Sequence, residues 1–156
     1  MSVLPYRLNV GICLFNKDKK VFVGERCDTD GAWQMPQGGI DEGEDYETAA
    51  FRELYEETGV QRQHAEIIKV MDDFLYYDFP QEVIDKYDHL KPYKGQKQKW
   101  IAMRFLGKDS DINLTAYKDE IEFSQWRWIE LENIIEYAVD FKTKVYKSVI
   151  GQFSKL

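Results

Sequence analysis

The sequence is poor in residues that cross-link a chain or interrupt it. It contains two cysteines, Cys13 and Cys27, and four prolines among 156 residues. Because these cysteines show neither a pairing pattern nor the spacing of metal ligands, neither a disulfide scaffold nor a cysteine-bound zinc site is expected. The chain also lacks an apolar run long enough to cross a bilayer, and its first residues lack the apolar segment of a signal peptide. We therefore expect a cytoplasmic protein that does not enter a membrane.

A surplus of positive charge is missing as well. The 28 acidic and 21 basic side chains leave a formal net charge of −7. Because binding to long nucleic acids depends on neutralising phosphates with basic residues, this balance argues against a surface for duplex nucleic acid. A phosphorylated small molecule or the end of an RNA chain remains compatible with it, if divalent cations bridge the two anionic partners.

What the chain does have is the composition of an ordinary globular protein. Apolar residues make up 44% and charged residues 31% of the sequence, and its length suits one hydrophobic core. We find no internal repeat, linker or low-complexity tract. A single domain over residues 1–156 is therefore expected. The sequence does not determine the oligomeric state, for which a monomer is the first choice.

Hydrophobic patterning predicts a chain dominated by strands. The turn at residues 16–20 predicts an early hairpin, which excludes an all-parallel sheet. Pro36, Gly38 and Gly39 predict an irregular stretch before the middle helix. The expected fold class is α+β, an α/β/α sandwich with a mixed central sheet between helices. Strands are expected over 6–15, 21–26, 97–106 and 126–129, an extended segment over 65–79, and helices over 45–58, 81–90 and from 131 to the end.

The most informative residues are three glutamates, Glu53, Glu56 and Glu57, in the middle helix. At positions i, i+3 and i+4 their carboxylates fall within an arc of about 100°. Like charges at this spacing repel by roughly a few tenths of a kcal/mol per pair, and a hard divalent cation such as Mg²⁺ removes that cost. Taken alone, the three glutamates are more typical of a solvated acidic face. The opposite, apolar face is expected to contain Ala50, Phe51, Leu54 and Tyr55.

The surroundings of the glutamates change that interpretation. Residues 38–60 match the Nudix box at all nine of its specified positions. The chain therefore resembles the Nudix hydrolases, and the resemblance implies metal-dependent hydrolysis of a phosphoanhydride bond in a nucleotide-like substrate. The matching positions are Gly38, Glu44, Arg52, Glu53, Leu54, Glu56, Glu57, Gly59 and Val60.

Physical roles for these residues follow from their chemistry. Gly38 lets the backbone approach a metal, so that a carbonyl can join the carboxylates of the three glutamates as ligands. Arg52 is expected to orient a glutamate through a bidentate pair, with Glu44 as the candidate partner. Glu53 is the first choice for a general base. The expected cofactor is Mg²⁺, with Mn²⁺ or another divalent cation as alternatives, and the predicted catalytic residues are Arg52, Glu53, Glu56 and Glu57.

The resemblance extends beyond the box to one branch of the family. Segments at 6–11, 33–39, 95–100 and 122–128 are similar to those of the bacterial RNA pyrophosphohydrolases and the related (di)nucleoside polyphosphate hydrolases. This implies removal of pyrophosphate from the triphosphorylated 5′ end of RNA, or cleavage of diadenosine polyphosphates. A catalytically inert nucleotide-binding module is the alternative of another class, although such modules usually lose a glutamate.

By matching position, the resemblance also implies substrate contacts. Arg7 and Arg26 would contact phosphates, and Phe141 would stack on a base, although its place on an apolar stripe also suits the core. Glu122 would be an outer metal ligand, with Glu120 as the alternative. The residues expected to border the cleft are Tyr77, Lys97 and Lys99.

Overall fold

A mixed sheet forms the centre of the computed structural model, which describes residues 3–117 and 119–156. Its long strands β1 and β7 run parallel over ten residue pairs, from Tyr6↔Gly95 to Phe15↔Arg104. The remaining pairs among the described strands are antiparallel, in the order β3-β2-β1-β7-β5, with β4 on β1, β6 on β7 and β8 on β2. The strands are β1 (Tyr6–Phe15), β2 (Val21–Arg26), β3 (Trp33–Gln34), β4 (Gln37–Gly39), β5 (Ala65–Val70), β6 (Leu75–Asp78), β7 (Gly95–Phe105) and β8 (Phe123–Ile129).

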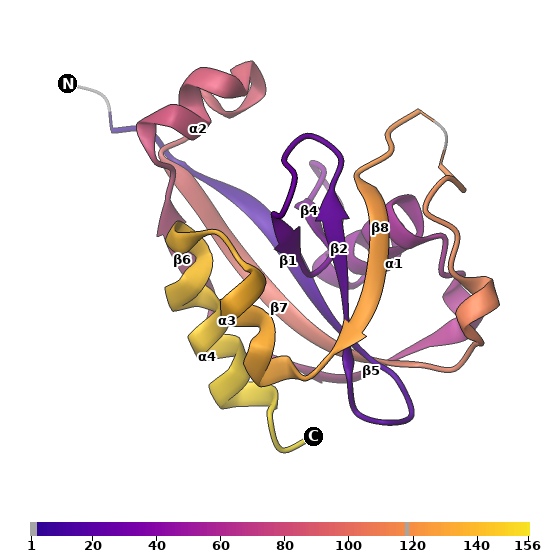
Figure 1. Cartoon of the computed structure of the whole chain (residues 1–156). Helices are drawn as coiled ribbons and strands as arrows, with labels where there is room; N and C mark the ends of the chain where they lie inside the picture. The colour runs from indigo at the N-terminus through magenta and orange to yellow at the C-terminus, as the bar shows by residue number, and fades with distance from the viewer. Residues whose placement is uncertain (1–2, 118) are drawn as a thin grey trace.

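Helices cover both sides of this sheet, as Figure 1 shows. The helix α1 (Tyr46–Thr58) packs on one side, and α3 (Ile134–Tyr137) and α4 (Thr143–Phe153) pack on the other, while α2 (Gln81–Lys86) lies in the segment between β6 and β7. The predicted sandwich with a mixed sheet is confirmed. No helix in the described part of the chain has the length and apolarity needed to span a membrane.

The alternation of side chains along β1 divides the core into two layers. Val10, Ile12 and Leu14 belong to the cluster beneath α1, whereas Cys13 and Phe15 belong to the cluster beneath α3 and α4. Because successive side chains of a strand point to opposite faces, a strand that is covered on both sides is apolar throughout. This explains why residues 10–15 of β1 form an uninterrupted apolar run, whereas its first half also contains Arg7 and Asn9.

Three predicted elements differ in the structure. The helix expected over 81–90 ends at Lys86, and a separate 3₁₀ turn covers Asp88–Leu90. The stretch expected to be irregular contains β4, because residues 37–39 pair with residues 9–11 of β1. The helix expected from Leu131 to the end is interrupted, because Ala138 and Val139 adopt extended conformations with ψ of 156° and 148°. A single 3₁₀ turn over Asp140–Lys142 follows, and α4 begins only at Thr143.

Candidate active site

The Nudix-box residues bring α1 against β4. Asp45 caps the start of α1 by accepting a hydrogen bond from the Thr48 N–H at 2.7 Å, and Gly59 ends it with a φ of 74°, a left-handed conformation that favours glycine. At Gly38, a Cβ atom would lie 1.9 Å from the carboxyl carbon of Glu53. Only glycine lets the strand approach this carboxylate so closely.

Arg52 connects the carboxylates around it. Its Nε and Nη2 donate to the two oxygens of Glu44 at 2.9 and 2.8 Å, so the predicted bidentate pair is confirmed. Its Nη1 donates to Glu53 at 2.8 Å and to Glu56 at 3.1 Å, and Nη2 also reaches the carbonyl of Gly39 at 2.9 Å. Arg52 therefore fixes the loop before α1 and orients two of the three glutamates.

The apolar face of α1 is rotated relative to the prediction. The buried side chains are Ala49, Ala50 and Leu54, whereas Tyr55 is 40% exposed. Glu57 shares the buried face, with 3% of its surface exposed. The three glutamates thus lie at the boundary between α1 and the sheet, and the interpretation as a solvated acidic face is wrong.

Burial disfavours the ionised form of these carboxylates, and Glu57 in addition lacks a partner for one oxygen. Glu57 Oε1 accepts the N–H of Gln37 at 3.1 Å, and Oε2 is buried without a hydrogen-bond partner among the described residues. Burial raises the pKa of Glu53 to about 7, although Arg52 opposes the shift, and it also raises the pKa of Glu56. The pKa of Glu57 is raised well above its ordinary value by burial and by the charges of Glu53 and Glu122.

This donor set fits a divalent cation. A bound cation would neutralise carboxylates that are costly to bury as anions, and it would satisfy the orphaned oxygen of Glu57. Within residues 3–117 and 119–156, no three acidic, histidine or cysteine side chains are already gathered into a complete ligand set. Glu53 and Glu56 are instead turned toward Arg52, and Glu57 toward Gln37.

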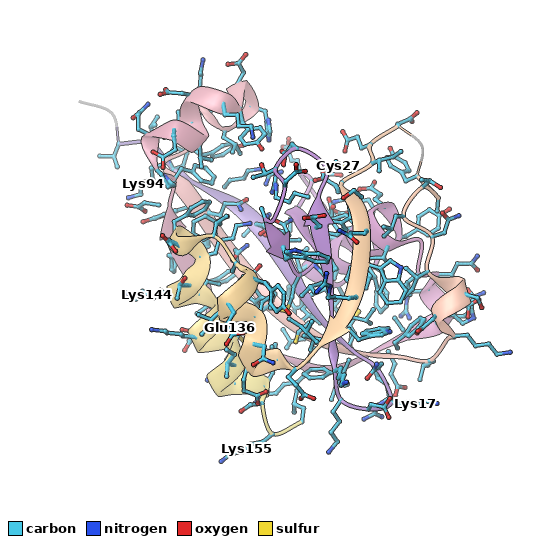
Figure 2. All side chains as sticks on the ribbon, viewed as in Figure 1. Lys17, Cys27, Lys94, Glu136, Lys144 and Lys155 are labelled. Atoms are coloured by element: carbon cyan, nitrogen blue, oxygen red, sulfur yellow. The ribbon has the colours of Figure 1, made fainter. Side chains whose placement is uncertain are left out.

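A cleft of about 820 Å³ opens beside Glu53 and Gly38. Its walls bring together cationic, aromatic and acidic side chains. The ring of Phe141 is half-buried and lies 5.6 Å from that of Tyr77. Figure 2 labels Cys27, which directly follows β2. Its backbone N–H donates to the carbonyl of Glu122, and this hydrogen bond holds the loop before β8 beside the end of β2. Besides Gly38 and Glu53, the structure places six further predicted residues in this lining: Arg7, Arg26, Tyr77, Phe141, Glu122 and the alternative Glu120.

The prediction that Lys97 and Lys99 border the cleft is wrong. Side chains of β7 alternate, so Gln96 lines the cleft while both lysines point to the opposite face. There the Lys97 ammonium lies 4.4 Å from the centre of the Phe74 ring, and Lys99 donates to the carbonyl of Asp72 at 3.0 Å.

Sequence reasoning missed Lys142, which is 6% exposed and lies in the cleft lining. Its ammonium donates to Gln34 Oε1 at 2.9 Å, and burial together with Arg26 lowers its pKa to about 7. A lysine directly after Phe141 was the available signal. Its burial depends on the interruption of the helix at Ala138 and Val139, which the apolar spacing does not reveal.

The raised carboxyl pKa values predict how stability depends on pH. Between its ordinary value of 4.5 and about 7, Glu53 binds more protons in the folded than in the unfolded state. The metal-free protein is therefore expected to lose roughly 1–3 kcal/mol of unfolding free energy as pH rises through this window. Denaturant unfolding at fixed pH values measures this loss. Glu53→Gln should make the profile shallower, since Glu56 and Glu57 still contribute to it. A wild-type profile that is flat or rises would contradict the prediction.

Comparisons with known proteins identify the family of this chain. The NUDIX domain matches residues 5–149. An RNA pyrophosphohydrolase of Wolbachia pipientis subsp. Culex pipiens is 48% identical over 151 residues, covering 97% of this chain and 91% of the relative. Among solved structures, the dihydroneopterin triphosphate pyrophosphohydrolase of E. coli has a TM-score of 0.74 at 17% identity, covering 96% of this chain and 97% of the other.

A second solved structure has the same fold. The Ap4A hydrolase of C. elegans, in a binary complex, has a TM-score of 0.66 at 20% identity and covers 95% of this chain and 99% of that one. At such low identity these two structures support the fold alone. Family membership depends instead on the domain match and the far more similar bacterial relative. The chain, as its Nudix box predicts, belongs to the Nudix family of hydrolases.

Proposed function

We propose that this hydrolase removes pyrophosphate from the triphosphorylated 5′ end of RNA, with Mg²⁺ as its working cation. The observation that carries the proposal is the single cleft that joins Glu53 and Gly38 to cationic and aromatic side chains. Relatives such as the Wolbachia protein are named RNA pyrophosphohydrolase, and their similarity covers nearly the whole chain. Family members generally use divalent cations, which agrees with the buried carboxylates.

The residues divide into those that act on the bond and those that hold the substrate. Glu53, Glu56 and Glu57 would hold the cation, with the Gly38 carbonyl and Glu122 as further candidates. When bound, the cation neutralises phosphate charge and lowers the pKa of a water molecule. Glu53 would take the proton of the attacking water while a new oxygen–phosphorus bond forms and the anhydride bond breaks. Burial, which raises its pKa, suits Glu53 to accept that proton.

The other end of the cleft would hold the phosphate chain and the first bases. Arg7 lines it with positive charge, and Lys142, with a pKa lowered to about 7, adds an amine that is partly protonated at neutral pH. Tyr77 and Phe141 offer adjacent ring faces. Stacking on aromatic rings tolerates any base, because every base has a π-face. Such a site would hold the first two or three nucleotides and would not need a long basic surface, in agreement with the net charge of −7.

A rate comparison tests the proposal. Hydrolysis of 5′-triphosphorylated RNA and of diadenosine tetraphosphate should be followed side by side with Mg²⁺ and, as a control, with excess chelator. We expect a higher kcat/KM on the RNA and no turnover with the chelator. A preference for the dinucleotide would identify a diadenosine polyphosphate hydrolase. Saturable binding without turnover of either would support the inert module, which the presence of all three glutamates argues against.

Replacing Phe141 tests the base-stacking role. Phe141→Ala is expected to lower kcat/KM on RNA by roughly tenfold, because stacking of one base on an aromatic ring contributes about 1–3 kcal/mol. Since Phe141 is only partly buried, its replacement should destabilise the fold less than Phe153→Ala, a matched control at a fully buried position. A core Phe→Ala costs about 3–5 kcal/mol. A comparable loss of stability in both variants, with RNA turnover unchanged by Phe141→Ala, would place Phe141 in the core.

A further inference from the structure

Most N–H donors of the Arg26 guanidinium already form hydrogen bonds within the protein. Its Nε and Nη2 donate to the two oxygens of Asp28, both at 2.8 Å. Nη2 also donates to the Tyr87 hydroxyl at 3.1 Å, and Nη1 donates to Gln34 Oε1 at 3.0 Å. Four of its five N–H donors are therefore engaged.

Arg7 provides the contrast within the same cleft. Among the described residues, its guanidinium donates one hydrogen bond, from Nη1 to Gln96 Oε1 at 2.8 Å. Arg7 can therefore receive a phosphate directly. Arg26 cannot offer its bidentate edge to a phosphate unless Asp28 leaves it.

Asp28 is itself held in place from two directions. Thr29 Oγ1 donates to its Oδ1 at 3.0 Å, and the hydroxyl of Tyr87 donates to Oδ2. Tyr87 follows α2 in the segment between β6 and β7, and Lys86 beside it donates to Thr29 Oγ1 at 3.3 Å. The loop after β2 and the segment around α2 are thus joined at Asp28, the partner of Arg26, and through the hydrogen bond of Lys86 to Thr29.

We propose that Asp28 is an internal counter-anion, which a substrate phosphate must displace from Arg26, and that Tyr87 holds it in that position. The inference depends on the proposed binding of polyphosphate in this cleft. A carboxylate carries one negative charge, whereas a polyphosphate offers several charges and more acceptor oxygens. The exchange therefore favours ligands with several phosphates and disfavours those with few, so Asp28 is a specificity-determining residue.

Binding of inorganic pyrophosphate with Mg²⁺, measured by calorimetry, tests the exchange without requiring turnover. Asp28→Asn keeps the shape of the side chain and removes its charge, so we expect the Kd to fall by roughly threefold or more. Asp30→Asn is the matched control, because it removes the same charge from an exposed position of the same loop. It should leave the Kd within experimental error of the wild type.

Two further variants separate displacement from a general effect. Tyr87→Phe removes one donor to Asp28 and one acceptor of Arg26, so it should lower the Kd by a smaller factor. In an Arg26→Gln background, Asp28→Asn should no longer tighten binding, because the competition is for Arg26.

An unchanged or raised Kd in Asp28→Asn and Tyr87→Phe would overturn the proposal, since Asp28 would then be orienting Arg26 for the ligand. If Asp28→Asn does not fold, Tyr87→Phe alone decides by the same criterion. Because pyrophosphate carries no nucleoside, the result is independent of whether RNA is the substrate. Failure of the proposed function would appear instead as absent RNA turnover with pyrophosphate binding intact.

Discussion

Glu53→Gln and Glu57→Gln are each expected to lower kcat on a 5′-triphosphorylated RNA by about 10²–10⁴-fold. Each variant keeps the shape of the side chain but removes a charge that would bind the cation or accept a proton. For Glu57, which is 3% exposed and carries an unsatisfied oxygen, the neutral amide also removes a buried charge. The melting temperature of metal-free Glu57→Gln should therefore equal or exceed that of the wild type.

A matched control lies on the same helix. Glu47→Gln makes the same change at an exposed position in the first turn of α1, and it should retain wild-type turnover. Steady-state kinetics at saturating Mg²⁺, together with thermal unfolding, separate the outcomes. Turnover near the wild-type rate in Glu53→Gln or Glu57→Gln would show that the replaced carboxylate is not needed for the reaction.

Gly38→Ala is expected to reduce kcat by roughly 10²-fold while leaving the protein folded. The added methyl group would overlap the carboxyl group of Glu53, whose nearest atom lies 1.9 Å from the new Cβ. The end of a glutamate side chain can move aside at little cost to the fold. That movement, however, displaces a reacting group by more than about 1 Å, which is enough to cost 10²-fold in rate.

Gly151→Ala is the control for the chemical change itself, because a Cβ at Gly151 would meet nothing within 4 Å. It should be fully active and slightly more stable, since alanine is favoured over glycine inside a helix by about 1 kcal/mol. If Gly38→Ala unfolded, or if it retained wild-type activity, the close approach of β4 to Glu53 would not be what positions this carboxylate.

The sequence predicted those parts of the fold that local patterns determine. The bounds of β1 and β2 agree with the structure, and α1 differs from its predicted range by one residue at its start. The pair of Arg52 with Glu44 was also accessible, because the two residues belong to one short motif. Such features depend on periodicity and spacing within a few turns of chain.

What could not be predicted depends on contacts between distant segments. Lys97 and Lys99 were assigned to the cleft, but the register of β7 against β1 directs Gln96 and Gln98 to that face. The burial of Lys142 follows from the break in the chain before Phe141, and apolar spacing does not reveal this break. The sequence also does not show that Tyr87 helps to engage Arg26, because these two neighbours in space are 61 positions apart in the chain.

The contrast between the two cysteines makes the native chain ready for site-selective labelling. Cys13 is sealed within the core beneath α3 and α4, and burial raises the pKa of its thiol well above the usual range. Cys27 is exposed between Arg26 and Asp28, and partial burial and nearby acidic groups raise its thiol pKa only to a lesser degree. A maleimide fluorophore applied at mildly alkaline pH should therefore attach at Cys27, between two residues that line the cleft. The natural protein thus supplies an optical reporter beside Arg26 and its partner Asp28.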